Sequence, residues 1–585
     1  MNLSTIKSNI KIETPIRPLY QDIFCLIILL GLNPITYFIQ LSQGIFPPDF
    51  FAYATMARDL FQKGLLYLPS WGHIDTGLIL PPLYPFLIAL GNFFSPETLA
   101  VAEIISSISM LVFSILLFLY MRMATNRLIA VITTAIIQLN YFYFLVGMMP
   151  LSESLFMLTI GLTLLLVVLL FRGDPKKQMI WSIFLGIASS LIFFSRQVGG
   201  IIFPFIGLFF LLRYLLVSAN DRRVLLYNFI FVICGIILLL LPYTAALYMQ
   251  TGHTLLTQRF REHEYVVKVN DPEILNEKKR ERKLPDQLLN SLKSRPDNDY
   301  GIIYAQRRQM RKLLPDASEM YDNISYVGKS KNGAIKKALF SSINLGVFFR
   351  QFYSNIIILK SVLGVYTFIL FFITCVSALL IKKENRRILN IFMLPSFIIM
   401  YLLAISFFTD RIARYIYILI PFCIMHISVE VYRYSTLLKS VFKREWSGFL
   451  LLVIIFPSIL LSTPRFFTEL HLNKKYLGME SNDGNYIKEI VDGEPVFSLF
   501  ALESYLIGSP YRYLPNDSLE KVAAYGKKTG VRWILIYHGR STANELTFYT
   551  NLGWYSDRSL EKAYPDLVKL RFATRDSIME LYEIL

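Results

Sequence analysis

Charge is scarce in this sequence. Asp, Glu, Lys and Arg make up only 17% of its 585 residues, whereas 54% are hydrophobic and the mean hydropathy is +0.47. A soluble domain would carry about 25% charged residues. Apolar runs long enough to cross a bilayer recur along the first 463 residues. The composition therefore excludes a soluble globular chain and predicts a polytopic membrane protein.

Cysteine is scarce too, and no cleavable signal peptide is evident. The four cysteines lie inside apolar runs, where they indicate small core residues and neither a disulfide framework nor a metal site: Cys25, Cys234, Cys375 and Cys423. The first apolar run, from Gln21 to about Gln43, is too long for a signal peptide and lacks a small-residue cleavage site. We expect it to be a retained first span.

Hydropathy predicts about eleven spans. They cover roughly 21–43, 98–121, 128–147, 151–171, 179–195, 198–216, 224–248, 356–381, 388–408, 415–434 and 447–463. The formal net charge is +17, and many basic residues lie in alternate short loops beside the spans. The positive-inside rule accounts for this pattern better than nucleic-acid binding, and it predicts a cytoplasmic N-terminus and an outer C-terminus.

Three larger segments then face outward: a loop over about 44–97, a loop over about 249–355 and a tail over 464–585. The middle loop is highly charged, which suits either a solvated surface or attraction of an anionic lipid headgroup. In the tail, EPVFSLF and VRWILIYH predict buried strands, SLEKVAAYGKK a helix, and LVKLRFATRDSIMELYEI two strands around a turn. We expect a small accessory α/β domain because no nucleotide fingerprint occurs there.

Ionisable residues beside the spans gather on the predicted outer side, and such residues are candidates for function. They are Asp49, Glu153, Arg196, Asp410, Arg411 and Arg414. Each alone has a structural explanation, because acids cap helix starts and arginines anchor at interfaces. Their joint placement on one side favours a site.

Other polar residues of the first outer loop carry weaker signals. Arg58 and Asp59, in MARDLF, predict a solvated helix face, and His73 and Asp75, in WGHIDTG, are either loop residues or substrate contacts. The apolar run Leu83–Phe94 is too short to span a bilayer, so it predicts a helix lying in the membrane interface.

These motifs resemble the GT-C class of membrane glycosyltransferases, in particular the bacterial protein O-mannosyltransferase-like and aminoarabinose-transferase-like enzymes. The resemblance covers about 1–463 and follows five segments in order: PDFFAYATMARDLFQKG, LPPLYPFLIAL, MPLSESLFML, FFSRQVGGIIFP and ARYIYILIP. Many members have Asp-Glu in the first loop, whereas here Asp49 is followed by Phe50. The tail also resembles the small soluble domain of many bacterial members.

The resemblance implies transfer of a sugar from a polyprenyl-phosphate donor to a glycan, lipid or protein acceptor, on the outer face of a bacterial inner membrane. Asp49 would accept the proton of the attacking hydroxyl, with Glu153 as a second acid, and direct displacement would invert the anomeric centre. The donor phosphate would meet Arg196, Arg414, Arg58 and Arg259, and the substrates would meet Tyr53, His73, Tyr84 and Tyr415. No cofactor is required on this account, although Asp49 with Glu153 could hold a divalent metal, as in oligosaccharyltransferases of the class.

Two other functions stay open. A flippase or transporter for a lipid-linked saccharide would carry polar residues near the membrane midplane and often has inverted repeats, whereas we find no internal repeat. An O-antigen ligase or polymerase of different fold would share the donor lipid and the membrane face. Such a ligase or polymerase usually lacks an Asp of this kind in its first outer loop, so substitution of Asp49 distinguishes it from a GT-C enzyme.

Overall fold

The computed structural model describes two regions of the chain. The first comprises residues 19–40, 48–66, 80–95, 98–172, 175–216, 219–251, 345–380, 385–408 and 413–442. The second, near the C-terminus, comprises residues 481–498, 509, 511–514, 518–537, 553–556, 560–573 and 579–585. The predicted span 447–463, most of the middle loop and the predicted boundary after residue 463 lie outside them.

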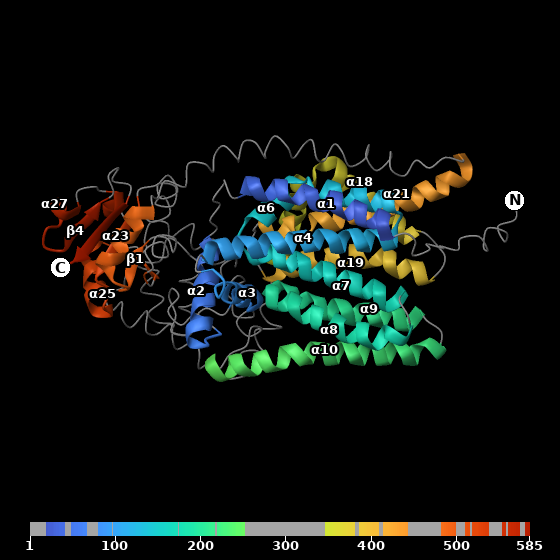
Figure 1. Ribbon diagram of the computed structural model, residues 1–585, viewed down its shortest axis with the longest axis horizontal. Helices are drawn as coiled ribbons and strands as arrows, with labels where there is room; N and C mark the ends of the chain where they lie inside the picture. Colours follow the sequence, from blue (N-terminus) through green and yellow to red (C-terminus); the bar gives the residue numbers. More distant parts are fainter. Residues whose placement is uncertain are drawn as a thin grey trace.

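A bundle of long apolar helices forms the first region (Figure 1). Its long members are α1 (Leu19–Gln40), α4 (Thr98–Ala124), α7 (Ser152–Arg172), α8 (Gln178–Ser195), α9 (Ile202–Leu216), α10 (Ala219–Thr251), α17 (Leu345–Leu363), α18 (Val365–Leu380), α19 (Asn385–Phe408) and α21 (Ile420–Phe442). Within the described residues, six helices are long and apolar enough to cross a membrane, or seven if the bent pair α17–α18 counts as one span. The chain is thus an α-helical polytopic membrane protein.

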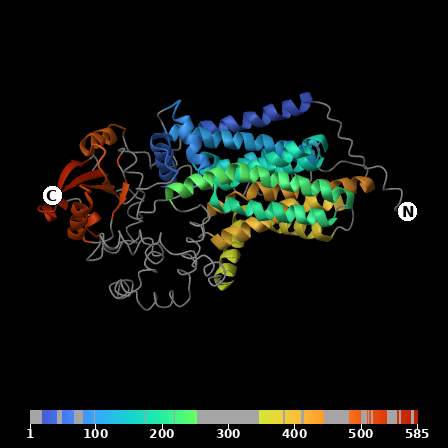
Figure 2. The same ribbon diagram turned by 90° about the horizontal axis from the view of Figure 1, so that it is seen from below.

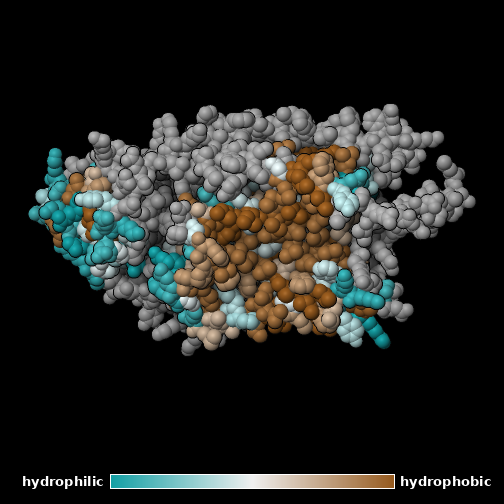
Figure 3. Space-filling model, viewed as in Figure 1, coloured by the Kyte–Doolittle hydropathy of each residue, from teal (hydrophilic) through white to brown (hydrophobic). Residues whose placement is uncertain are grey.

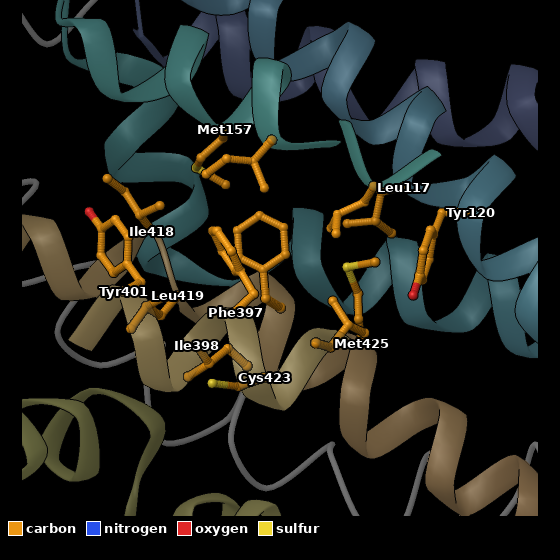
Figure 4. Close-up of a cluster of buried hydrophobic side chains, with 14 of the residues drawn as sticks. Leu117, Tyr120, Met157, Phe397, Ile398, Tyr401, Ile418, Leu419, Cys423 and Met425 are labelled. Carbon is orange, nitrogen blue, oxygen red and sulfur yellow. The ribbon is translucent and has the colours of Figure 1, made fainter. Parts of the chain in front are cut away.

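Burial separates central helices from peripheral ones. The apolar stretches Ser152–Phe171 of α7 and Tyr415–Ser435 of α20 (Ala413–Tyr417) and α21 are each 78% buried, whereas that of α10 is only 22% buried. Aromatic and aliphatic side chains of α4, α7, α19 and α21 fill the centre, around Phe397 and Tyr401 (Figure 4). On the face seen in Figure 3, the exposed surface of the bundle is mostly hydrophobic. Such a surface suits lipid, where every backbone polar group must be satisfied within a helix.

Helix α10 attaches to the bundle through a close contact with α8. A Cβ atom on Gly186 would lie 2.1 Å from the carbonyl oxygen of Val232, and one on Gly235 would lie 2.2 Å from that of Ile183. Glycine has no side chain, so it lets these two helix backbones approach so closely. Small residues have the same effect at other contacts between membrane helices.

The bundle has two chemically different ends. At one, which we call the basic end, Asp22 of α1 binds Arg127 at 2.6 Å and Arg122 at 3.3 Å, and the Arg213 guanidinium lies 3.7 Å from the centre of the Phe171 ring. At the other, which we call the site end, α2 (Pro48–Lys63) and α3 (Leu83–Gly91) pack against the starts of α4 and α7. Two perpendicular views place α2 at this end (Figures 1 and 2). This arrangement agrees with a one-sided set of basic loops.

Two predicted spans are not single straight helices. The predicted span 128–147 is α5 (Arg127–Gln138) followed by α6 (Tyr141–Met148), and the Asn140 side chain caps α6 by accepting a hydrogen bond from the Phe142 N–H at 3.0 Å. The predicted span 356–381 begins inside α17, which itself starts at Leu345. The chain then bends by 115° between α17 and α18, at Gly364, whose φ is +77°. The short helix predicted near Leu83 is confirmed as α3.

The C-terminal region is a five-stranded sheet with helices on both faces. Its order is β2 (Tyr511–Tyr513), β1 (Val496–Ser498), β3 (Trp533–Tyr537), β5 (Met579–Ile584) and β4 (Val568–Ala573). β1 pairs in parallel with β2 and β3, and the other pairs are antiparallel. Helix α23 (Ser481–Val491) packs on one face and α25 (Leu519–Thr529) on the other. The predicted strands and α25 are confirmed, whereas α23 and β2 were not predicted.

Candidate functional site

Two candidate acids lie at helix starts at the site end. Asp49 is the second residue of α2, and Glu153 is the second residue of α7. A helix N-terminus favours a carboxylate because its unpaired N–H groups carry partial positive charge. The Glu153 side chain is buried, with 3% of its surface exposed, whereas the Asp49 side chain lies outside the described part of the structure.

Arg196 forms an ion pair with Glu153 in the interior of the protein. Arg196 ends α8 in an extended conformation, immediately before the short 3-10 helix η3 (Gln197–Ile201), and it is 8% exposed. Its guanidinium carbon also lies 4.4 Å from the centre of the Tyr415 ring, a cation–π contact. Tyr415 belongs to α20 (Ala413–Tyr417). One guanidinium therefore joins α7, the α8–η3 junction and α20.

The surroundings of Arg196 are electrostatically compensated. Burial lowers the pKa of Arg196, but the Glu153 carboxylate and the hydroxyls of three tyrosines (Tyr415, Tyr53 and Tyr401) raise it, and the net shift is upward. Arg196 is thus a permanent cation. Removing one partner of a buried ion pair typically costs about 3–5 kcal/mol because the other charge is left uncompensated.

A second network, of hydroxyl groups, lies beside this pair. The Tyr53 and Ser152 hydroxyl oxygens are 3.0 Å apart. The Tyr84 hydroxyl donates to the Ala102 carbonyl at 3.1 Å and lies 3.0 Å from the Ser106 hydroxyl. The rings of Tyr53 and Tyr84 meet edge to face, with their centres 5.3 Å apart. Burial raises the pKa of Tyr84, which keeps its hydroxyl neutral.

The matching family model covers part of the chain that contains this cluster. Residues 80–248 match the family described as dolichyl-phosphate-mannose-protein mannosyltransferase. The matched segment runs from α3 to α10 and includes Tyr84, Glu153 and Arg196. No curated protein matches the sequence.

Solved structures share the fold at low sequence identity. The apo oligosaccharyltransferase of Archaeoglobus fulgidus matches with a TM-score of 0.54 and 14% identity, over 96% of this chain and 74% of that one. AglB of the same organism, in complex with an inhibitory peptide and a dolichol-phosphate, matches with a TM-score of 0.51, 12% identity and the same coverage. ArnT of Cupriavidus metallidurans bound to undecaprenyl phosphate matches with a TM-score of 0.49 and 12% identity, over 95% of this chain and 97% of that one.

The fold is that of the GT-C glycosyltransferases. The resemblance noted from the sequence motifs is therefore confirmed at the level of the fold.

Within this GT-C fold, the remaining predicted site residues are spread more widely. Arg58 lies exposed on α2, and its guanidinium is 3.9 Å from the Asp59 carboxylate. Asp59 was predicted to be solvated, but it is 2% exposed and pairs with Lys63 at 3.3 Å, because α2 turns this residue into the protein. Arg414 belongs to α20, and its side chain lies outside the described part of the structure. His73, Asp75, Arg259, Asp410 and Arg411 also lie outside the described residues.

Several residues of the GT-C site end were not found from the sequence. Ser152 and Ser106 carry no charge and gave no signal. Glu103 lies partly buried on α4. An acid inside an apolar run is a candidate for function, and the sequence analysis did not recognise Glu103 as one. Among the described residues, no group of three or more His, Cys, Asp or Glu side chains could hold a metal ion.

Proposed function

We propose that this glycosyltransferase transfers a sugar from a polyprenyl-phosphate donor to an acceptor hydroxyl, at the site end and on the outer face of a cell membrane. The observation that carries the proposal is the buried Glu153–Arg196 pair against Tyr415, beside the helix whose second residue is Asp49. The family match to a mannosyltransferase that uses dolichyl-phosphate-mannose supports a lipid-linked donor. One structure of the same fold holds a dolichol-phosphate, and another is tethered to an acceptor peptide.

The reaction is a single displacement. The acceptor oxygen attacks the anomeric carbon of the donor sugar, and the bond from that carbon to the phosphate oxygen breaks. The polyprenyl phosphate leaves with the bonding electrons, and the acceptor proton passes to the Asp49 carboxylate as general base. Attack opposite the leaving phosphate inverts the anomeric centre. Asp49 suits this role because α2 carries it at the site end, in the first turn of the helix.

The leaving phosphate needs positive charge, which α8 and α20 can supply. A guanidinium has five N–H donors in a fixed fork, so Arg196 can bind Glu153 along one edge and a phosphate oxygen along another. Arg414 is adjacent in sequence to Tyr415, whose ring contacts Arg196. We assign Arg196 and Arg414 to the phosphate, and Glu153 to holding Arg196 in place.

Asp49→Asn tests the base, since it keeps the shape of the side chain and removes its basicity. Loss of a general base typically lowers the rate by about 10²–10⁴-fold. We expect a loss of that size in sugar transfer by the purified protein, with binding of the polyprenyl donor changed much less.

Asp22→Asn is the matched control, because it makes the same change at the basic end. It should leave the transfer rate close to that of the unmodified protein. Near-normal turnover in Asp49→Asn would remove Asp49 from the role of base, and Glu153→Gln would then be the next variant to measure.

A further inference from the structure

A side-chain hydrogen bond joins the two helix turns that carry the candidate acids. Tyr53 lies one helical turn after Asp49, so both residues lie on one side of α2. Ser152 immediately precedes Glu153 at the start of α7. The Tyr53 and Ser152 hydroxyls are bonded at 3.0 Å across 99 residues of sequence, and both side chains are buried. The bond therefore connects one acid-bearing turn to the other.

A second tyrosine braces this connection. The fully buried Tyr84 packs its ring against the Tyr53 ring and is itself fixed to α4 by the Ala102 carbonyl and the Ser106 hydroxyl. Ser106 also donates to the Leu151 carbonyl at 3.4 Å, in the turn that leads into α7. Helices α2, α3, α4 and α7 are thus held together at one point.

We propose that the Tyr53–Ser152 hydrogen bond, braced by Tyr84 and Ser106, sets how the turns bearing Asp49 and Glu153 face each other. This inference rests on the function proposed above. Tyr53 and Ser152 are then positioning residues, and Tyr84 supports them. This differs from the sequence prediction, in which Tyr53 and Tyr84 contact the substrates. Their hydroxyls bond to protein groups inside the fold. A displacement of about 1 Å at a reacting group can cost on the order of 100-fold in rate, so such a device has a measurable effect.

Removing one hydroxyl at a time tests the bond. Tyr53→Phe keeps the ring and its contact with Tyr84, and Ser152→Ala removes the other partner. In the full-length protein we expect each to lower kcat by roughly tenfold to 100-fold, because Asp49 shifts relative to a donor that Arg196 and Glu153 still hold. KM for the donor should be nearly unchanged. Ser152→Thr retains a hydroxyl and should recover most of the rate.

Tyr143→Phe is the matched control. Tyr143 is a buried tyrosine whose hydroxyl bonds to Ser114 and to the Met110 carbonyl, inside the bundle. The substitution removes the same atom from a comparable bond outside the acid-bearing turns. It should leave kcat unchanged, even if the melting temperature falls as much as in Tyr53→Phe.

The double variant Tyr53→Phe with Ser152→Ala sharpens the test. Both changes remove the same bond, so the double variant should be no slower than the slower single variant. Multiplying losses, a rise in KM alone, or a kcat for Tyr53→Phe equal to that of Tyr143→Phe would each overturn the inference.

Asp49→Asn and Glu153→Gln, measured alongside, separate the two proposals. If both keep normal turnover, the acid site itself is wrong, and the positioning role is overturned with it. If they lose turnover while Tyr53→Phe does not, only the positioning role is overturned.

Discussion

In the described part of the helical bundle, two glutamate–arginine pairs have a buried glutamate, and they differ in how much of the chain each one joins. Glu153 and Arg196 come from different helices and meet at the site end against Tyr415. Glu430 and Arg433 are three residues apart on α21, and the Arg433 side chain is 20% exposed. The second pair can form whenever α21 is helical, whereas the first requires three elements to be correctly packed. A long-range pair therefore fixes geometry, and a local one mainly offsets charge.

Replacing each arginine by methionine should give the largest difference in sugar transfer between the two pairs. Arg196→Met leaves Glu153 buried without its cation, at a typical cost of about 3–5 kcal/mol in stability, and it should abolish transfer. Arg433→Met also leaves a buried glutamate without its cation, but transfer should stay near normal, because both residues of this pair lie on one helix. Thermal unfolding in detergent and a transfer assay measure both effects. Equal losses of transfer in the two variants would contradict the distinction.

Exchanging the partners should have an intermediate effect. Glu153→Arg combined with Arg196→Glu restores opposite charges, so it should recover part of the melting temperature lost by Glu153→Arg alone. Transfer should stay low, because the guanidinium no longer projects from the α8–η3 junction. The same exchange at Glu430 and Arg433 should retain transfer. An active Glu153/Arg196 exchange would show that only the charge pair matters and not its orientation.

The smallest effect is expected at an ion cluster whose two arginines reach the surface. In the C-terminal sheet Glu583 binds Arg532 and Arg571. Burial raises the pKa of Glu583, but the hydrogen bonds from the two arginines outweigh it, and the pKa lies below its usual value. The resulting stability is present above the unfolded-state pKa and is lost as the pH falls through the folded-state pKa. Arg532 and Arg571 are exposed, so solvent screens their attraction to Glu583 and the contribution to stability is small.

Glu583→Gln should remove this acid dependence. The test is the melting temperature of the full-length protein between neutral and acidic pH, followed by a signal from the C-terminal region. The difference between Glu583→Gln and the unmodified protein should shrink as the pH falls. A difference that grows on acidification would contradict the assigned sign.

Hydropathy predicted most of the bundle, because a membrane helix is recognisable from the average of its own residues. It missed the breaks, because a break depends on one residue: Asn140 capping α6, or Gly364 adopting a left-handed conformation. The sheet was mostly predicted, because its longer strands are apolar runs. The three-residue β2 is too short to give such a signal.

At the site, the one-sided placement of ionisable residues correctly indicated that Glu153, Arg196 and the ARYIYILIP segment belong at one end. The pairing itself could not be predicted, because it depends on the packing of α7 against α8. The roles of the tyrosines were equally hidden, since a sequence does not reveal that the partner of Tyr53 is a serine 99 residues away.

The glycine contact between α8 and α10 has a consequence for sequence variation. The most buried positions of the first half of α10 are Leu225, Asn228, Val232 and Gly235, which recur every three or four residues and form one narrow stripe. Because Gly186 and Gly235 each face a backbone carbonyl, enlarging one cannot be rescued by shrinking a neighbouring side chain. Saturation mutagenesis of α10 should therefore show a helix that accepts almost any apolar residue around most of its circumference and almost none along this line.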